Sequence, residues 1–368
     1  MNSRRPLRIV HLTTAHPPDD IRIRHKECAA LVSAGHDVHL VARGPLTAGD
    51  KVRHHPITTE GESLGRVRRL FIGQIRAWRA ARRLKADVLH VHDPELIPLA
   101  IALKLTSRSR VIYDAHEFLP RQIMGKSYLP QAVRPLLAFL AESLERLAAR
   151  HLDGIVVAVP AMTQSFTRAR SICVVQNFPW ARDYSEPTPL PGTGTAGYVG
   201  GLSIGRGLRA MLDLSDNHPS VPLLLAGNLQ PPTLGAEVHK SQGVTYVGVL
   251  PPSGVGKFLS RLDVGLCLLQ PLPNYVDAQS TKLYEYMAAG RPFIYSHFPS
   301  WVAQLDPTGA GIAVDPMSSD EIEEAVLRLV SDQELAATMG ANGRQAFLER
   351  FCFEAEGQRF ADWTRDLA

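Results

Sequence analysis

Short runs of apolar residues alternate with segments of helical periodicity along most of the chain. The runs are three to six residues long, which is the length of a buried strand rather than of a helix. The first half contains predicted strands at 7–12, 38–41, 88–91, 110–113 and 154–157. The second half contains further predicted strands at 196–199, 223–226, 245–247 and 264–268. This alternation indicates a parallel, doubly wound α/β sheet.

The alternation is interrupted once, where residues 178–197 are rich in Pro, Gly, Ser and Thr. Such a stretch is typical of an interdomain linker. We therefore expect two Rossmann-like domains, 1–180 and 181–350, that face each other across a cleft. Because ligands of open α/β sheets bind at the carboxyl ends of the strands, site residues are expected at strand exits.

The composition is that of an ordinary globular protein, with 45% hydrophobic and 21% charged residues among 368. Four cysteines lie far apart among apolar neighbours and are expected to be reduced core thiols: Cys28, Cys173, Cys267 and Cys352. Residues 1–20 have neither the apolar core of a leader peptide nor that of an anchor. We expect a cytoplasmic protein whose contact with the inner face of the plasma membrane is at most peripheral.

The net charge of +4 is unevenly distributed, because residues 64–85 contain seven Arg and one Lys without any acid. Val67, Leu70, Phe71, Ile75 and Trp78 recur there at helical spacing, so the segment is predicted to be a basic amphipathic helix. Two interpretations stay open: the apolar stripe packs on its own domain, or it docks on an anionic membrane or a lipid acceptor. No nucleic-acid-binding module is recognisable, and nucleic acid is not expected as a partner.

The segment 273–292 has the most informative pattern. Asp277 and Glu285 flank a predicted helix start, with Ser280 as the expected N-cap and Lys282 in the first turn. Free backbone N–H groups at a helix N-terminus attract phosphate. A carboxylate one turn further along accepts hydrogen bonds from sugar hydroxyls. Together these features indicate a site for a nucleotide sugar.

A glycine-rich turn follows the first strand of the second half and contains Gly200, Gly201, Gly205, Arg206 and Gly207. Glycines let the backbone approach a phosphate closely, and the arginine adds a charge beside it. The turn alone is a weak signal, since many such turns are only tight connections.

In the first half, His116 follows a strand exit, where an imidazole can orient an acceptor hydroxyl or take its proton. The first strand-exit loop offers further acceptor contacts through Asp20, Arg22 or Arg24. His90 and His92, with Asp93 and Glu95 close behind, have the residue types of metal ligands. We expect no metal site there, because the chain has no Asp-x-Asp motif.

The order of these motifs resembles that of the family 4 retaining glycosyltransferases of GT-B fold. In that family two acids separated by seven residues precede a Met-Ala-Ala-Gly-x-Pro run, as they do here. Further matching segments are His-Pro-Pro-Asp-Asp-Ile-Arg-Ile-Arg-His-Lys-Glu (16–27), His-Asp-Pro-Glu-Leu (92–96), Tyr-Asp-Ala-His-Glu (113–117) and Tyr-Val-Gly-Gly-Leu (198–202). The resemblance implies a GT-B fold in which residues 351–368 return as a helix to the first domain.

The resemblance also implies roles for single residues. Glu285 would hold the ribose hydroxyls, and Asp277, where the family usually has Glu, would contact the donor sugar. Gly201 stands at the first of two basic positions of the family and Arg206 at the second, so we expect Lys282 to share the task of the missing cation. The family uses helix dipoles and cations in place of a divalent metal, so neither a metal nor another cofactor is expected.

The predicted function is transfer of a sugar, with retention, from a nucleoside-diphosphate donor to a hydroxyl of a sugar, lipid-linked or small-molecule acceptor, in surface polysaccharide or glycolipid synthesis. The alternatives are a soluble natural-product glycosyltransferase, a nucleotide-sugar epimerase or a lapsed binding module. The residues predicted to carry this activity are His116 and Asp277 at the reacting centre, Gly200, Gly201, Arg206, Ser280, Thr281, Lys282 and Glu285 for the donor, and His16, Asp20, His92 and Glu117 for the acceptor.

Overall fold

A computed structural model describes residues 5–45, 51–58, 69–125 and 129–368. The chain forms two compact units, of which the first comprises Met1–Asn177 with Phe353–Ala368 and the second Phe178–Cys352. The sequence placed the corresponding boundaries after residues 180 and 350. The last helix therefore belongs to the first unit, although it follows the second in the chain.

The first unit contains a parallel sheet with the strand order β3-β2-β1-β4-β5-β6-β7. Its strands are β1 Arg8–Leu12, β2 Asp37–Ala42, β3 Arg53–Pro56, β4 Val88–Val91, β5 Arg110–Ala115, β6 Gly154–Val157 and β7 Ile172–Val174. The five strands predicted in this half are all present, which confirms the fold class. The two that were missed, β3 and β7, are the edge strands of the sheet.

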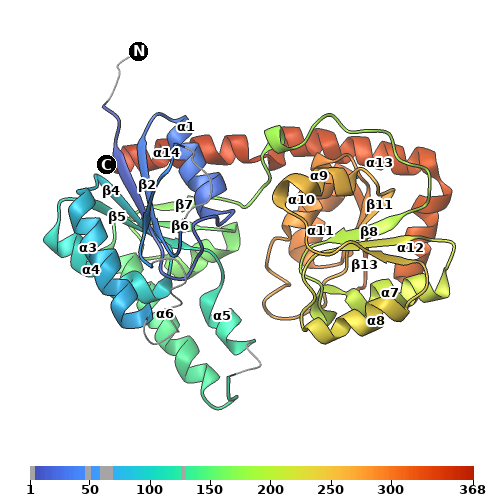
Figure 1. Cartoon of the computed structure of the whole chain (residues 1–368), viewed down its shortest axis with the longest axis horizontal. Helices are drawn as coiled ribbons and strands as arrows, with labels where there is room; N and C mark the ends of the chain where they lie inside the picture. The colour runs from blue at the N-terminus through green and yellow to red at the C-terminus, as the bar shows by residue number, and fades with distance from the viewer. Residues whose placement is uncertain (1–4, 46–50, 59–68, 126–128) are drawn as a thin grey trace. The chain divides into compact units, whose positions relative to one another are not determined.

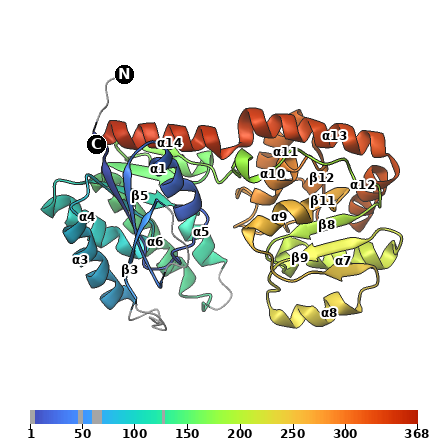
Figure 2. The ribbon, with the colours of Figure 1, turned by 45° about the horizontal axis from the view of Figure 1, so that its top comes forward.

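Helices cover both faces of this sheet (Figures 1 and 2). They are α1 Ala29–Ser33, α3 Gln74–Leu84, α4 Ile97–Thr106, α5 Leu119–Met124, α6 Arg134–His151 and α14 Phe353–Leu367. The helices α3, α4 and α6 form one layer, in which α4 contacts both neighbours, and α14 packs on α1. The layer of α3, α4 and α6 covers a core of aliphatic side chains that includes Val10, Leu89 and Val111.

Histidines occupy inward positions on the two central strands of this sheet. His11 on β1 is paired in register with His90 on β4, and both side chains are fully buried. Their rings stack with centroids 4.5 Å apart, and the His90 ring also meets the edge of Phe360 on α14. The apolar runs therefore predicted β1 and β4 correctly, although each of these short strands contains one buried histidine.

The second unit contains a parallel sheet with the order β10-β9-β8-β11-β12-β13. Its strands are β8 Ala196–Val199, β9 Leu223–Ala226, β10 Val244–Tyr246, β11 Val264–Cys267, β12 Phe293–Ser296 and β13 Gly311–Val314. Its helices are α7 Leu208–Asn217, α8 Gly235–Lys240, α9 Pro252–Leu259, α10 Thr281–Ala288, α11 Pro299–Leu305, α12 Ser319–Ser331 and α13 Gln333–Ala346. The four strands predicted in this half are present, whereas β12 and β13 were not predicted.

Two glycines allow the exits of β8, β9 and β11 to approach one another. A Cβ atom on Gly227 would lie 1.7 Å from the carbonyl oxygen of Gly200, and one on Gly207 would lie 2.2 Å from that of Leu268. Gly207 also has a φ of +83°, which L-residues with side chains rarely adopt. The backbone around the end of β8 therefore tolerates only glycine at these positions.

Each sheet has one topological switch point, where successive connections leave in opposite directions. It lies between β1 and β4 in the first unit and between β8 and β11 in the second. Open α/β sheets bind their ligands at the carboxyl ends of the strands beside such a point. In both units the predicted site residues follow these strands or the adjacent β5.

Among the described residues, no helix is both long and apolar enough to cross a bilayer. All four cysteines lie in the described part of the chain, and none forms a disulfide. Three of them are buried, as the sequence predicted, and Cys352 is partly exposed.

A buried carboxyl group should make the stability of the first unit depend on pH. Glu145 on α6 is buried, and burial raises its pKa to about 7, against the opposing effect of its hydrogen bond with Tyr113. In an unfolded chain the pKa of a glutamate side chain is about 4.3, so the folded state binds this proton more tightly. Its stabilising effect is therefore complete below about pH 4 and is lost as the pH rises to about 7.

We expect Glu145→Gln to remove this part of the pH dependence. At pH 8 the variant should gain about 1–3 kcal/mol in unfolding free energy relative to the natural chain, and little or nothing at pH 4.5. Thermal unfolding of both proteins from pH 4.5 to 8 measures the difference. Parallel profiles for the two proteins would contradict this assignment of the Glu145 pKa.

Candidate functional site

In the second unit, the turn that follows β8 brings Arg206 back over Gly201. A Cβ atom on Gly201 would lie 2.8 Å from Nη1 of Arg206, so the arginine occupies the space that a side chain at 201 would need. The pKa of Arg206 is raised, despite partial burial, by its contacts with Tyr198 and Tyr275. Because residue 201 is a glycine, the guanidinium of Arg206 has room to lie over it.

The turn after β8 meets the loop after β11. Gln270 donates a backbone hydrogen bond to the carbonyl oxygen of Gly205 at 2.9 Å, and a Cβ atom on Gly205 would touch Leu272 and Tyr275. Both loops leave neighbouring strands at the switch point of this sheet. The glycine-rich turn and the 273–292 segment, which are about 70 residues apart in the sequence, therefore build one site.

Ser280 is at the N-cap position of α10, as predicted, but its side chain does not cap the helix. Its hydroxyl oxygen instead accepts a hydrogen bond from the thiol of Cys267, with 3.2 Å between Sγ and Oγ. Cys267 is the last residue of β11 and is fully buried, so burial raises the pKa of its thiol to about 12. The expectation of a side-chain cap was wrong, because the strand end provides a closer partner, and the first N–H groups of α10 are left without that cap.

Lys282 and Glu285 form an ion pair on the first turn of α10, next to Thr281, which begins the helix. The ammonium of Lys282 lies 2.9 and 2.8 Å from the two carboxylate oxygens, and the Glu285 side chain is only 15% exposed. Glu285 is therefore not a solvated surface residue. The charges of Lys282 and Arg206 oppose the effect of burial on the pKa of the Cys267 thiol at the end of β11, and that of Glu285 adds to it.

Asp277 lies in the loop between β11 and α10, where it is half-buried. This loop is tied to α11 at two points. The indole of Trp301 donates to the carbonyl oxygen of Ala278 at 2.6 Å, and the hydroxyl of Ser300 donates to that of Val276 at 3.1 Å. The loop is thus held on both sides of Asp277.

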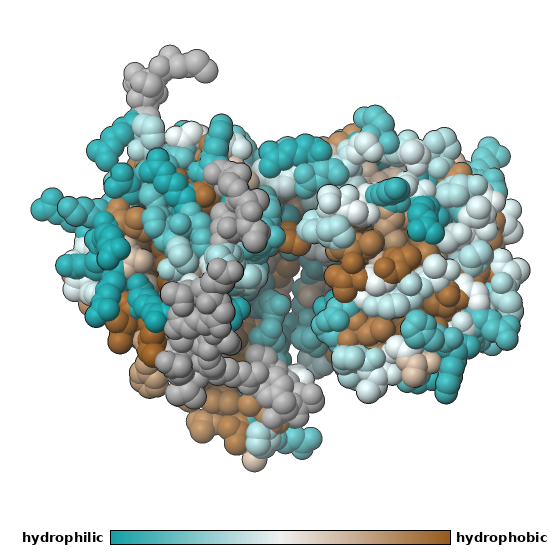
Figure 3. All heavy atoms as spheres, in the orientation of Figure 1, coloured by the Kyte–Doolittle hydropathy of each residue, from teal (hydrophilic) through white to brown (hydrophobic). Residues whose placement is uncertain are grey.

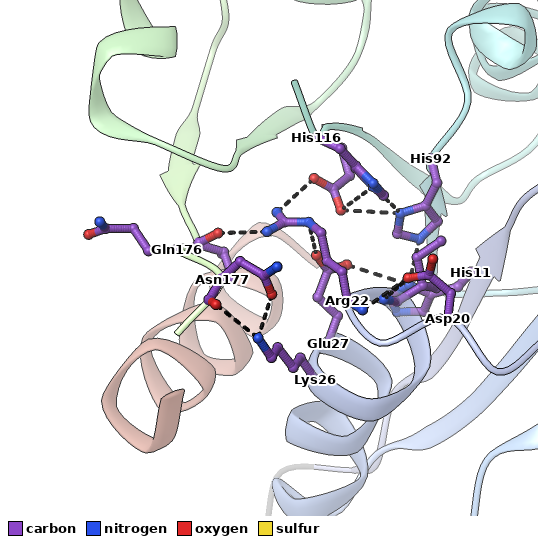
Figure 4. Close-up of polar contacts among 12 residues, drawn as sticks. His11, Asp20, Arg22, Lys26, Glu27, His92, His116, Gln176 and Asn177 are labelled. Atoms are coloured by element: carbon purple, nitrogen blue, oxygen red, sulfur yellow. Dashed lines mark hydrogen bonds and ion pairs between the residues drawn. The ribbon is translucent and has the colours of Figure 1, made fainter. Parts of the chain in front are cut away.

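In the first unit, side chains from β1, β4 and β5 and the segments that follow them form a polar cluster (Figure 4). His92, directly after β4, and His116, directly after β5, approach each other with 3.1 Å between Nδ1 and Nε2. Oδ2 of Asp114 lies 3.1 Å from the same atom of His92 and 3.2 Å from that of His116. His92 and Asp114 are fully buried, whereas His116 is 16% exposed. Only His116 of these three can reach a ligand from solvent.

A buried arginine joins this cluster to two other elements. Arg22 lies 3.0 Å from Oδ1 of Asp114 and 3.0 Å from Oε1 of Glu27, and it donates to the carbonyl oxygen of Val175 at 2.9 Å. Burial alone would raise the pKa of Asp114, but Arg22 and the neighbouring histidines hold it well below the usual range. Burial and the Asp114 charge raise the pKa of Glu27.

The expected acceptor contacts of Arg22 and Arg24 are not possible in this structure. Both side chains are buried, with 8% and 2% exposure. The alternating pattern after β1 did not reveal their burial, because charged residues usually lie at the surface. Arg22 instead serves as the counter-charge of Asp114.

His16 and Asp20 lie at the exposed side of the same cluster. Nδ1 of His16 is 3.0 Å from Oδ2 of Asp20, and the two rings of His16 and His116 are 5.2 Å apart. The hydrogen bond with Asp20 raises the pKa of His16, while His16 helps to lower that of Asp20 to about 2 against the effect of burial. The predicted residues His16, Asp20, His92 and His116 are therefore brought together.

Glu117 departs from this group. It is exposed and accepts a hydrogen bond from the amide of Gln122 on α5. No described contact directs its carboxylate toward His116. Its predicted role in acceptor binding gains no support from this placement.

The predicted basic helix of residues 64–85 is present in its described part, as a helical turn Arg69–Gly73 that continues into α3. Residues 64–68, including Val67, lie outside the described residues, and the side chain of Leu70 is not described. Phe71 and Ile75 are 68% and 52% exposed, whereas Ala77 and Ala81 are buried. Trp78, a third member of the predicted apolar stripe, packs against the core together with Ala81, whereas Phe71 and Ile75 face outward.

Several partners in these clusters were not identified from the sequence. They are His11, Glu27 and Asp114 in the first unit, and Tyr198, Cys267 and Tyr275 in the second. Most are strand residues that read as part of apolar runs. The only available signal was a polar residue inside such a run, as at His11 and Asp114.

Comparison with known families agrees with this geometry. Residues 25–178 match the family model "Glycosyltransferase Family 4", and residues 204–346 match "Glycosyl transferases group 1". The chain is a family 4-type glycosyltransferase. The two matches correspond closely to the two units, and the second contains every predicted donor residue from Arg206 to Glu285.

Solved structures with the same fold cover nearly all of this glycosyltransferase. A sucrose-phosphate synthase from Thermosynechococcus elongatus has a TM-score of 0.80 at 18% identity, with 99% of each chain covered. HepE of Anabaena in complex with UDP has a TM-score of 0.71 at 14% identity, covering 98% of this chain and 100% of its own. An α,α-trehalose 6-phosphate synthase from Burkholderia multivorans has a TM-score of 0.69 at 16% identity, with 98% of each chain covered. At these identities the likeness establishes the GT-B fold, and no curated protein sequence matches the chain.

The buried Arg22 should be among the most important residues for the stability of the first unit. We expect Arg22→Leu to reduce the unfolding free energy by about 3–5 kcal/mol, because it leaves buried carboxylates without a counter-charge. Arg53→Leu is the matched control: this arginine lies 3.2 Å from Asp37 but is 65% exposed, so its loss should cost about 1 kcal/mol at most. Urea unfolding of both variants measures the difference, and equal losses would contradict the central role of Arg22.

Proposed function

We propose that this glycosyltransferase moves a hexosyl unit from a nucleoside-diphosphate sugar to an acceptor hydroxyl, with retention of anomeric configuration. The observation that carries the proposal is that the turn holding Arg206 contacts the loop leading to α10, whose start carries the Lys282–Glu285 ion pair. HepE, a protein of the same fold, has been solved in complex with UDP and with UDP-glucose, which supports a uridine diphosphate donor.

Each group at the start of α10 has a chemical task in this proposal. The free N–H groups of the first turn and the guanidinium of Arg206 receive the diphosphate. Lys282, now paired with Glu285, turns its charge toward the phosphate, while Glu285 accepts hydrogen bonds from the ribose hydroxyls. Negative charge develops on the diphosphate as the glycosidic bond breaks, so these donors stabilise the transition state more than the ground state.

We further propose that neither a divalent metal nor a cofactor is needed at the diphosphate, because Arg206, Lys282 and the helix start provide the positive charge. Retention is proposed to arise from departure and attack on the same face of the sugar, which requires only a positioned donor, acceptor and electrostatic support. His116 and Asp277 remain the residues proposed for the reacting centre.

The proposed acceptor is membrane-linked, as in the synthesis of a surface polysaccharide or a glycolipid. Exposed Phe71 and Ile75 lie on the basic segment 69–84, and exposed Leu136, Phe139 and Leu140 lie on α6. The helices α3 and α6 belong to one layer, and Figure 3 shows hydrophobic residues gathered where Figure 1 draws α5 and α6. Apolar side chains flanked by arginines favour an anionic bilayer surface. A small natural-product acceptor is the second candidate.

Donor binding can be tested without knowledge of the acceptor. Thermal stability is measured with uridine, guanosine, adenosine and thymidine diphosphates and their sugars, for the natural chain and for Glu285→Ala. A nucleotide at 100 times its dissociation constant should stabilise the protein by about 2.7 kcal/mol. We expect stabilisation by one base that is lost in Glu285→Ala and kept in the control Glu324→Ala, an exposed glutamate on α12. No stabilisation of folded protein by any of these nucleotides would overturn the donor site.

Membrane recognition requires a separate experiment. Activity is compared on a lipid-linked acceptor in anionic vesicles and on a water-soluble acceptor, for the natural chain and for Arg79→Gln with Arg83→Gln. Both arginines are exposed on α3, so the double variant should lose activity on vesicles and keep it on the soluble acceptor. Replacement of exposed Arg209 and Arg261 in the second unit is the control for net charge. Equal activity of all three proteins on vesicles would favour the natural-product acceptor.

A further inference from the structure

Three ligand atoms converge beside the exit of β5 in the first unit. Nδ1 of His92, Nε2 of His116 and Oδ2 of Asp114 form a triangle with edges of 3.1, 3.1 and 3.2 Å. Figure 4 shows that the rings of His92 and His116 turn toward each other. The triangle is nearly equilateral, although its corners come from different side chains on two chain segments.

Hydrogen bonds cannot form along all three edges of this triangle at once. A ring nitrogen either carries a proton or offers one lone pair. If both facing nitrogens carry protons and donate to Asp114, the two N–H groups oppose each other at 3.1 Å; if only one does, its proton can bridge the two rings. In the second arrangement Oδ2 of Asp114 receives no hydrogen bond from either ring, and it is a buried oxygen without a hydrogen-bond partner in the structure. A buried polar atom in this state requires another explanation. A cation at the centre would contact all three corners at once.

Neighbouring side chains fix the orientation of His92 and Asp114, as hydrogen-bond partners of metal ligands commonly do. Nε2 of His92 lies 2.8 Å from Nδ1 of His11, so a proton on Nε2 of His92 leaves its Nδ1 free to face the triangle. Oδ1 of Asp114 is held by Arg22 at 3.0 Å, which leaves Oδ2 for the triangle. Partners of this kind fix the tautomer and the direction of metal ligands.

We propose that His92, Asp114 and His116 bind a divalent first-row transition-metal ion. Bond lengths of about 2.1 Å imply ligand separations of about 3.0 Å in octahedral and about 3.4 Å in tetrahedral coordination, and the observed edges lie between these values. Two imidazoles and one carboxylate suit Zn²⁺, Fe²⁺ or Co²⁺ better than Mg²⁺ or Ca²⁺. With three protein ligands, the ion keeps an open position.

A second group in the same cluster fits a metal less well. His11, Glu27 and His92 also bring possible ligand atoms together. The atoms of His11 and His92 are 2.8 Å apart, which is a good hydrogen bond, and Glu27 lies 4.0 Å from His11, so the three separations are much less even than those of the proposed site. The proposed site also differs from the set that the sequence excluded, because it contains neither His90, Asp93 nor Glu95. A bound ion would engage Nε2 of His116, so only Nδ1 of that ring would remain for the role at the reacting centre proposed above; the diphosphate of the donor needs no metal in either case.

The test measures metal binding directly, on tag-free protein that has been treated with a chelator. Equilibrium dialysis against Zn²⁺ and visible absorption on addition of Co²⁺ are recorded for the natural chain and for His116→Ala. We expect one ion per natural chain with ligand-field bands of bound Co²⁺, and binding at least 100-fold weaker in His116→Ala. His116 is partly exposed, so this variant should fold, and circular dichroism confirms that it does.

The matched control is His55→Ala. His39 and His55 also form a close imidazole pair, at 2.8 Å, but Asp37 approaches the other ring nitrogen of His39 at 3.3 Å, so three ligand atoms do not converge. Metal binding should therefore be unchanged in this variant. The proposal is overturned if the natural chain binds no Zn²⁺ or Co²⁺ at 100 times the protein concentration. It is equally overturned if folded His116→Ala binds them as the natural chain does, or if His55→Ala abolishes binding.

Discussion

The first unit depends on the ion pair between Arg22 and Asp114. Arg22 follows β1, Asp114 ends β5, and the same guanidinium reaches Glu27 and the carbonyl oxygen of Val175 after β7. Three strand exits and the segment before α1 are thus held by one side chain. The desolvation of such a pair is costly, and the attraction between the two charges at 3.0 Å offsets this cost. His92 and His116 are positioned through their contacts with Asp114, so the order at the exposed edge of the site originates from this buried pair.

In the second unit the site is held mainly by close backbone contacts and less by buried charges. This site is formed where the backbone after β8 closely approaches the segments after β9 and β11, which Gly227 and Gly207 make possible. Arg206 and the Lys282–Glu285 pair are added to this backbone frame at the edge of the sheet. A backbone surface suits a phosphate, which needs close N–H groups, whereas a buried charge network suits side chains that must keep one orientation.

Much of this arrangement could be predicted from the sequence, because apolar runs of four or more residues correspond to buried strands. The missed edge strand β3, with the sequence Arg-His-His-Pro, contains no apolar run at all. The position of Ser280 at a helix start was also predictable, since it depends on nearby residues. The partner of its hydroxyl was not, because Cys267 is 13 residues away and comes from a strand. The pairing of Arg22 with Asp114 spans 92 residues and follows only from the order of the strands in the sheet.

The position of Arg206 over Gly201 has a consequence for substitutions at residue 201. The guanidinium fills the volume in which any larger residue at 201 would have to sit. A basic residue at 201, as related enzymes have, and the present conformation of Arg206 therefore exclude each other. Because the contact is with the flexible end of Arg206, a side chain at 201 would displace the guanidinium from this position, so the residue at 201 helps to set the conformation of residue 206. The place of the positive charge over the turn after β8 thus depends on the small size of residue 201 as well as on Arg206 itself.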